Sequence, residues 1–196
     1  MAKDLRPIGV DFDDVVANFN DALRVYHNAR YGTAYEYGDI NTFYLEVLWC
    51  CSKEEMMQRV DEFYHSQEHT GMLPVEGAIA ALTELSKHYS LVMITSRPDH
   101  IREYTLKWIA EHIPHVFSDT HFLGHYVAGD HVHKSKGDVC KEIAARVLID
   151  DALHNAASVS TQGIPALLLD APWNQGPLPK LVTRVMSWDE ILEQLL

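Results

Sequence analysis

The feature that most constrains the fold is a series of short apolar runs separated by helical patterns. Runs short enough to be strands, and bounded by turn or charged residues, are typical of strands buried on both faces. They are PIGVDF (7–12), SLVMIT (90–95), HFLGHY (121–126), RVLIDD (146–151), PALLLD (165–170) and the shorter LVTRV (181–185). Strands that alternate with helices in this way predict an α/β fold with a doubly wound, Rossmann-like parallel sheet.

A long interval between the first and second runs breaks this rhythm. It contains a helical pattern from Asn18 to Arg30 that Gly32 ends, and a second helix that begins at a capping box of Ser52 and Glu55. This interval is too long for one crossover connection. We therefore expect 18–74 to form a small helical cap inserted after the first strand, and 1–17 with 75–196 to form the α/β core.

Charge and cysteine content exclude several classes of protein. A formal net charge of -12 argues against duplex nucleic acid as a partner, because binding to duplex phosphates needs clustered Lys and Arg. The three cysteines form no CxxC pair, which fits a reducing compartment better than a disulfide framework. Because no stretch reaches the roughly 20 apolar residues of a membrane span, we expect a cytoplasmic protein with no membrane partner. A homodimer is left open.

Acidic residues gather where two of the predicted strands end. Asp11 and Asp13 follow the first strand and point to the same side, and Asp150 and Asp151 end the fourth. Because the carboxyl ends of parallel strands meet at one edge of a sheet, these four carboxylates predict a site for a hard cation such as Mg²⁺. The alternatives are a solvated acidic turn at the first pair and helix N-caps at either pair.

Hydroxyl and basic residues follow two other strands. Thr95 and Ser96 end the second strand, and Lys136 begins the helix after the third. Hydroxyls, backbone N–H groups and an ammonium at a helix start can hold a phosphoryl group. The alternatives are a strand-end hydroxyl at Thr95 and a surface lysine, since Lys134 and Lys141 are nearby.

Together these segments resemble the four motifs of the haloacid dehalogenase (HAD) superfamily, in its phosphatase branch. DFDDVVANF resembles the opening of the 5'(3')-deoxyribonucleotidases, ITSRP the hydroxyl motif, Lys136 the lysine motif and LIDDALHNA the acidic motif. One DxD pair would be weak evidence, whereas four motifs in order, at strand ends or at the start of a helix, are a specific pattern. The resemblance covers the core, about two thirds of the chain.

The resemblance implies a two-step phosphoryl transfer. Asp11 would attack phosphorus to give an aspartyl-phosphate, and Asp13 would act first as the acid and then as the base. Thr95 and Lys136 would stabilise the charge that develops on the phosphoryl oxygens. These four residues are the catalytic residues that we expect.

The resemblance also implies the metal ligands. Mg²⁺ would bind Asp11, the backbone carbonyl of Asp13 and Asp150, and Asp151 would assist directly or through a neighbouring ligand. Asp14 departs from the family pattern, because glycine is usual at this position of the loop. An aspartate there could instead cap the following helix.

The implied substrate is a nucleoside monophosphate. Phe19 matches the family position that stacks on the nucleobase, although an aromatic residue there could simply pack in the cap. We expect Ser96 and Arg97 to contact the substrate too, although Arg97 could instead pair with Asp99. A sugar phosphate or other small phosphomonoester is the alternative substrate, and a nucleotide-binding protein without catalysis is the alternative function.

Overall fold

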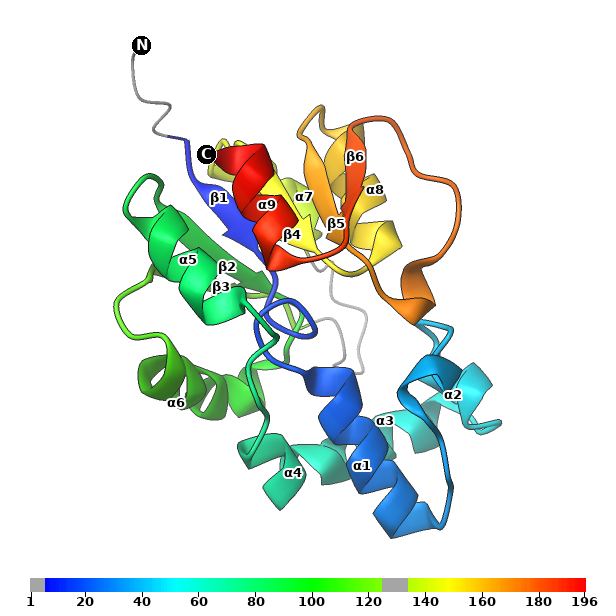
Figure 1. The fold of residues 1–196 in the computed structure, drawn as a ribbon. Helices are drawn as coiled ribbons and strands as arrows, with labels where there is room; N and C mark the ends of the chain where they lie inside the picture. Colours follow the sequence, from blue (N-terminus) through cyan, green and yellow to red (C-terminus); the bar gives the residue numbers. More distant parts are fainter. Residues whose placement is uncertain (1–5, 125–133) are drawn as a thin grey trace.

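The structure is a computed structural model that describes residues 6–124 and 134–196 (Figure 1). Its centre is a parallel sheet of six strands in the order β3-β2-β1-β4-β5-β6. The strands are β1 (Ile8–Val10), β2 (Leu91–Thr95), β3 (Phe117–Phe122), β4 (Val147–Asp150), β5 (Ala166–Leu169) and β6 (Val182–Val185). This order is that of a doubly wound Rossmann-like sheet, so the predicted fold class is confirmed.

Helices cover both faces of the sheet. Successive strand residues point to opposite faces, so Met93 packs into one hydrophobic cluster and Ile94 into another. The first cluster contains residues of α5 (Ala78–Ser86), α6 (Arg102–His112) and α9 (Trp188–Leu195), and the second contains residues of α7 (Lys136–Glu142) and α8 (Leu153–Thr161). Burial on both faces explains why the central strands are apolar throughout.

Residues 18–74 form four α-helices, which Figure 1 shows gathered beyond the end of β1. They are α1 (Phe19–Tyr31), α2 (Leu45–Leu48), α3 (Lys53–Tyr64) and α4 (Gln67–Thr70), with a 3-10 turn at Tyr37–Asp39. As predicted, α1 ends at Gly32 in the left-handed conformation, and the Ser52 side chain caps α3 by accepting the N–H of Glu55. We call 18–74 the helical insert; its boundaries as a separate cap stay a prediction.

The third strand lies earlier in the chain than predicted. The apolar run HFLGHY predicted a strand at 121–126, but β3 spans Phe117–Phe122, and 125–126 lie outside the described residues. Since β3 is at the edge of the sheet, its side chains are half-buried or exposed and need not be apolar. The predicted position was wrong because an apolar run marks a strand that is buried on both faces, and β3 is not buried in this way.

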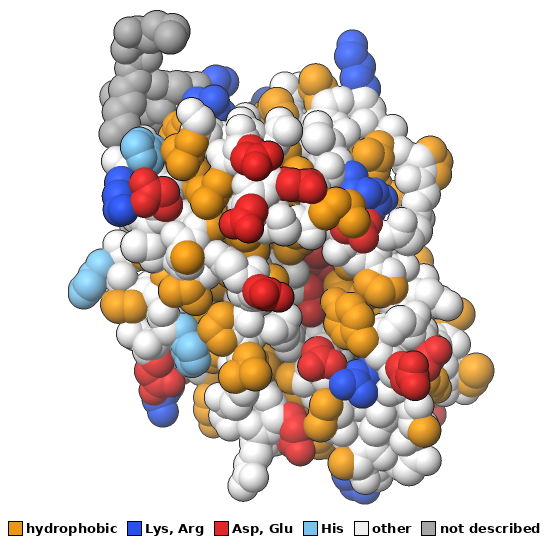
Figure 2. Space-filling view, in the orientation of Figure 1, with side chains coloured by type: hydrophobic (Ala, Val, Ile, Leu, Met, Phe, Trp, Pro, Cys, Tyr) orange, Lys and Arg blue, Asp and Glu red, His pale blue; other side chains and the backbone are white. Residues whose placement is uncertain are grey.

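Within the described parts of the chain, no helix is both long enough and apolar enough to cross a membrane. On the face shown in Figure 2, the Lys and Arg side chains are dispersed, and Asp and Glu side chains lie around a hollow.

His27 is buried in the helical insert. Its ring stacks on Trp49 with centroids 4.3 Å apart, and its Nε2 accepts a hydrogen bond from Arg59 Nη1 at 3.0 Å. Its Nδ1 donates to Thr33 Oγ1 at 2.9 Å, since the Thr33 hydroxyl itself donates to Asn28. Burial, aided by the charge of Arg59, lowers the pKa of His27 to about 4. His27 is therefore neutral in the folded protein.

We expect His27 to make the free energy of unfolding fall as the pH falls from about 6.5 towards 4. In this range the unfolded histidine binds a proton that the folded one does not, so acid favours unfolding. The loss from this residue is about 2 kcal/mol between about pH 7.5 and about pH 5. Urea unfolding at both pH values, on the wild type and on His27→Gln, measures it, because glutamine keeps an acceptor for Arg59 but does not titrate. An equal loss in both proteins would contradict the prediction.

Candidate active site

The site lies where the order of the strands reverses, between β1 and β4. Val10 pairs with Ile149 in the sheet, and the Asp11 N–H donates to the Ile149 carbonyl at 2.9 Å. Asp11 therefore leaves β1 beside Asp150, the last residue of β4. In doubly wound sheets this crevice at the carboxyl ends of the strands is where ligands bind.

Three carboxylates converge at this point. Asp11, Asp150 and Asp151 each offer an oxygen, and these oxygens lie within 4.8 Å of one another. All three side chains are buried. Closely spaced, buried carboxylate oxygens are the donors that Mg²⁺ prefers, so this set fits the predicted metal. The Asp13 carboxylate lies outside this group, so its part in metal binding, through its backbone carbonyl, stays a prediction.

A buried lysine joins two of these carboxylates. Lys136 Nζ lies 2.7 Å from Asp11 Oδ1 and 2.7 Å from Asp150 Oδ2. It is the first residue of α7, whose N-cap is Ser135. Lys134, the nearby alternative, pairs with Glu142 at the surface. The structure thus brings Lys136 into the site, and not Lys134.

The close spacing and burial of these groups shift the pKa values of Asp11, Asp151 and Lys136. Burial, and to a smaller extent the neighbouring carboxylates of Asp150 and Asp13, raises the pKa of Asp11 to about 7, although the charge of Lys136 lowers it. Burial also raises the pKa of Asp151 well above its usual value. For Lys136 burial lowers the pKa, but the contacts with Asp11 and Asp150 outweigh it and raise the pKa overall. Additional positive charge would therefore stabilise the ionised carboxylates.

Neutral side chains that were not among the predicted site residues contact Asp150, the last residue of β4, and Asp151, which follows it. Asn155 Nδ2 donates to Asp150 Oδ1 at 3.1 Å, and the Trp173 indole donates to Asp151 Oδ2 at 2.6 Å. Asn174 Nδ2 donates to the Asp151 carbonyl at 2.7 Å. The signal for the last two is the tripeptide PWN after β5, which forms a 3-10 turn at Pro172–Asn174.

The Asp13 carboxylate pairs with Arg97. Arg97 Nη2 lies 2.8 Å and Nε 3.0 Å from Asp13 Oδ1, and the arginine is only 1% exposed. The alternative pairing of Arg97 with Asp99 is wrong, because Asp99 pairs with Arg102 instead. The guanidinium also contacts Thr105 and His69. A contact of Arg97 with the substrate stays a prediction.

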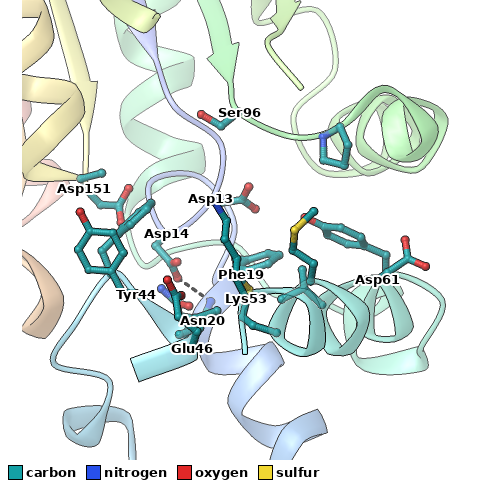
Figure 3. A pocket seen from close by; sticks show the side chains of 18 of the residues that line it. Asp13, Asp14, Phe19, Asn20, Tyr44, Glu46, Lys53, Asp61, Ser96 and Asp151 are labelled. Atoms are coloured by element: carbon teal, nitrogen blue, oxygen red, sulfur yellow. Dashed lines mark hydrogen bonds between the residues drawn. The ribbon is translucent and has the colours of Figure 1, made fainter. Parts of the chain in front are cut away.

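Asp14 adopts the backbone conformation that favours glycine. Its φ of 56° lies in the left-handed region, where aspartate is one of the better tolerated residues. Its Oδ1 accepts the N–H of Asn20 in the first turn of α1 at 2.9 Å (Figure 3), whereas the side chain of Asn18 makes no capping hydrogen bond. The expectation that Asp14 caps the following helix is confirmed, and burial raises the pKa of its carboxyl.

The two residues of the hydroxyl motif lie differently. Thr95 is fully buried, and its Oγ1 accepts the N–H of Arg97 at 3.2 Å. Ser96 lines the cavity described next, on the side of the sheet (Figure 3). Their contacts with a phosphoryl group stay predictions.

A cavity of about 810 Å³ opens above the carboxylates. Figure 3 shows Asp13, Ser96 and Asp151 on its core side, with Phe19 and Asp61 on the side of the helical insert. The insert contributes apolar and aromatic side chains, which are Phe19, Phe43, Tyr44, Leu45, Met56, Met57, Val60 and Tyr64. It also contributes polar or charged ones, which are Asn20, Thr42, Glu46, Lys53, Gln58 and Asp61. The Phe19 ring packs edge-to-face on Phe63, with centroids 5.3 Å apart. Phe19 therefore both packs in the insert and faces the cavity.

Comparisons with known proteins agree with this geometry. YqfW of Bacillus subtilis, which has nucleotidase in its name, is 23% identical over 190 residues, which cover 95% of this chain and 91% of YqfW. The haloacid dehalogenase-like hydrolase SP0104 of Streptococcus pneumoniae has the same fold, with a TM-score of 0.69, 17% identity and coverage of 98% and 99%. YfnB of Bacillus subtilis, solved bound to magnesium, has a TM-score of 0.65, 14% identity and coverage of 97% and 98%.

A family model matches almost the whole sequence. It spans residues 5–196 and is described as 5' nucleotidase, deoxy (pyrimidine), cytosolic type C protein. The match includes both the strand-end carboxylates and the helical insert. Its fold is that of HAD-like hydrolases such as SP0104. The chain belongs to this 5' nucleotidase family (NT5C), and it is a phosphoric monoester hydrolase.

Proposed function

We propose that this protein is a Mg²⁺-dependent nucleotidase that removes phosphate from (deoxy)nucleoside monophosphates through an aspartyl-phosphate on Asp11. The observation that carries the proposal is the pairing of Asp11 with Lys136 within a group of three buried carboxylates. This group lies at one end of a cavity that the helical insert covers with aromatic side chains. Phosphoryl transfer requires a nucleophile and positive charge near the phosphoryl oxygens, and aromatic side chains suit a leaving group that carries a planar base.

In the first half of the reaction, an oxygen of Asp11 attacks phosphorus. A new bond forms between this oxygen and phosphorus, and the bond to the leaving oxygen breaks. Asp13 gives its proton to that leaving oxygen, so the nucleoside departs as an alcohol. Lys136 stabilises the negative charge on the phosphoryl oxygens, with the hydroxyls of Thr95 and Ser96 as further donors.

In the second half, water replaces Asp11 on phosphorus. Asp13 is now a carboxylate and takes a proton from the water as its oxygen bonds to phosphorus. The bond between phosphorus and Asp11 breaks, which releases inorganic phosphate and restores the Asp11 carboxylate. Mg²⁺ bound by Asp11, Asp150, Asp151 and the backbone carbonyl of Asp13 would neutralise the phosphoryl charge in both halves.

The lining of the cavity supports a nucleotide over a sugar phosphate. Phe19 and Tyr44 present aromatic rings, and Met56 and Met57 present flexible thioethers. These side chains suit a planar base better than a sugar ring that carries hydroxyl groups. The description of the family and the name of YqfW point to the same substrate class. From the family description we also propose a cytosolic location; a homodimer stays a prediction.

A substrate panel tests the proposal. Phosphate release is measured from 5'- and 3'-(deoxy)nucleoside monophosphates and from sugar phosphates, with Mg²⁺, with EDTA, and with Mg²⁺ restored after EDTA. We expect kcat/KM for the best nucleotide to exceed that for the best sugar phosphate by about tenfold or more, since an aromatic contact of about 1 kcal/mol or more is lost with the base. EDTA should abolish release, and restored Mg²⁺ should recover it.

Other results would separate the alternatives. A preference for a sugar phosphate would keep the chemistry and reject the nucleotide. Saturable nucleotide binding without turnover, in a folded protein supplied with Mg²⁺, would indicate a binding protein. Full activity in EDTA would contradict the metal requirement.

A further inference from the structure

Arg97 is buried beside the site and forms an ion pair with Asp13. This pair is separate from the ion pairs of Lys136. The guanidinium of Arg97 donates to Asp13 through Nη2 and Nε, and its Nη1 donates to Thr105 Oγ1 at 2.9 Å. It also lies over the ring of Phe12, 4.4 Å from its centroid, and Nη1 is 3.3 Å from Nε2 of His69. The arginine is thus fixed from the core and from the helical insert at once.

The pair distinguishes the two oxygens of Asp13. Oδ1 accepts from both Nη2 at 2.8 Å and Nε at 3.0 Å, whereas, among the residues that the structure describes, Oδ2 accepts only the longer contact from Nε, at 3.1 Å. The Asp13 side chain is 25% exposed and lines the cavity, while Arg97 is 1% exposed. Oδ1 is therefore the anchored oxygen, and Oδ2 is the oxygen with capacity left to carry or accept a proton.

We propose that Arg97 is a positioning residue that fixes the Asp13 carboxyl so that Oδ2 exchanges the proton with the leaving oxygen and then with water. The proposal rests on the proposed function. In the first half the Oδ2–H bond breaks as the leaving oxygen gains that proton, and in the second half Oδ2 regains a proton from water. Thr105 holds the far side of the guanidinium, because its own hydroxyl donates to the Ile101 carbonyl and so accepts from Arg97.

Variants at these two positions test the proposal. Arg97→Lys keeps the charge but loses the fork that contacts Oδ1 through two nitrogens. Thr105→Val is nearly isosteric and removes only the hydroxyl that holds the guanidinium. Arg102→Lys is the matched control, because Arg102 forms an ion pair with Asp99 that is exposed at the surface. Circular dichroism and thermal unfolding establish that each variant is folded.

The readout is the rate of the first turnover on two substrates. A deoxynucleoside monophosphate has an alkoxide leaving group that needs a proton, whereas p-nitrophenyl phosphate has a leaving group stable without one. We expect Arg97→Lys to slow the first turnover on the nucleotide by about tenfold to a hundredfold, at or below the roughly 10²-fold lower end of acid catalysis, because Asp13 is displaced and not removed. On p-nitrophenyl phosphate the first turnover should change by less than about threefold. A slow steady state should follow, because the second half still needs Asp13 as the base and Arg97→Lys no longer fixes its carboxylate.

The outcomes separate this proposal from a structural role and from the proposed function. Equal slowing of the first turnover on both substrates would overturn the positioning role, because general damage does not depend on the leaving group. If Arg97→Lys does not fold, Thr105→Val decides, with the same selectivity at about threefold to tenfold. Wild-type protein inert on both substrates would overturn the proposed function, and this inference with it.

Discussion

Replacement of Asp11 by asparagine is expected to lower kcat for phosphate release by about 10⁴-fold or more, the scale of losing a covalent nucleophile. The amide has nearly the same shape as the carboxylate and still offers Lys136 an acceptor. It has no anionic oxygen to bond to phosphorus, so the aspartyl-phosphate cannot form. Affinity for the substrate should change far less than kcat, because the side chain keeps its volume.

A chemical trap makes this prediction specific. Wild-type protein quenched in acid during turnover of a nucleotide radiolabelled in its phosphate should carry the label, and Asp11→Asn should carry none. Asp99→Asn is the control, since its carboxylate is exposed and pairs with Arg102 at the surface. Label on Asp11→Asn, or turnover near the wild-type rate, would place the nucleophile elsewhere.

The fold and the acidic centre of the site were readable from sequence because both depend on local patterns. β4 is buried along its length and therefore appears as the apolar run that ends in Asp150. The position of Asp11 beside Asp150 then follows from a rule of parallel sheets, since β1 and β4 end at the same edge. Lys136 was predicted because it begins a helix, and the resemblance to known motifs separated it from Lys134.

The residues that hold the site were not readable in the same way. Arg97 and Asp13 are 84 positions apart, and Trp173 and Asp151 are 22 apart, and no local pattern reports such a pairing. Arg97 also follows the hydroxyl motif of Thr95 and Ser96, where a basic residue suggests a contact with the substrate. Its guanidinium contacts Asp13 and Thr105. Edge strand β3 was misplaced for a related reason, because a strand with exposed sides has no apolar run to mark it.

Replacement of Lys136 by methionine is expected to have two separate effects. Activity should fall by about 10²-fold to 10³-fold, the usual cost of removing one donor that stabilises transition-state charge. In EDTA the free energy of unfolding should also fall by about 3–5 kcal/mol, because Asp11 and Asp150 lose a buried cation 2.7 Å from each. Methionine fills much of the volume of the lysine stem, so the loss reports charge more than packing.

Magnesium should then separate the two roles of Lys136. A divalent cation bound by Asp11, Asp150 and Asp151 supplies positive charge to the same carboxylates, so Mg²⁺ should stabilise Lys136→Met more than the wild type in urea unfolding. Activity should stay low, because the ammonium that we propose stabilises the phosphoryl oxygens is still missing. Lys134→Met is the control: its pair with Glu142 is exposed, and its loss should cost less than about 1 kcal/mol. If Lys136→Met in EDTA were as stable as Lys134→Met, the carboxylates would not depend on this lysine, and the electrostatic account of the site would be wrong.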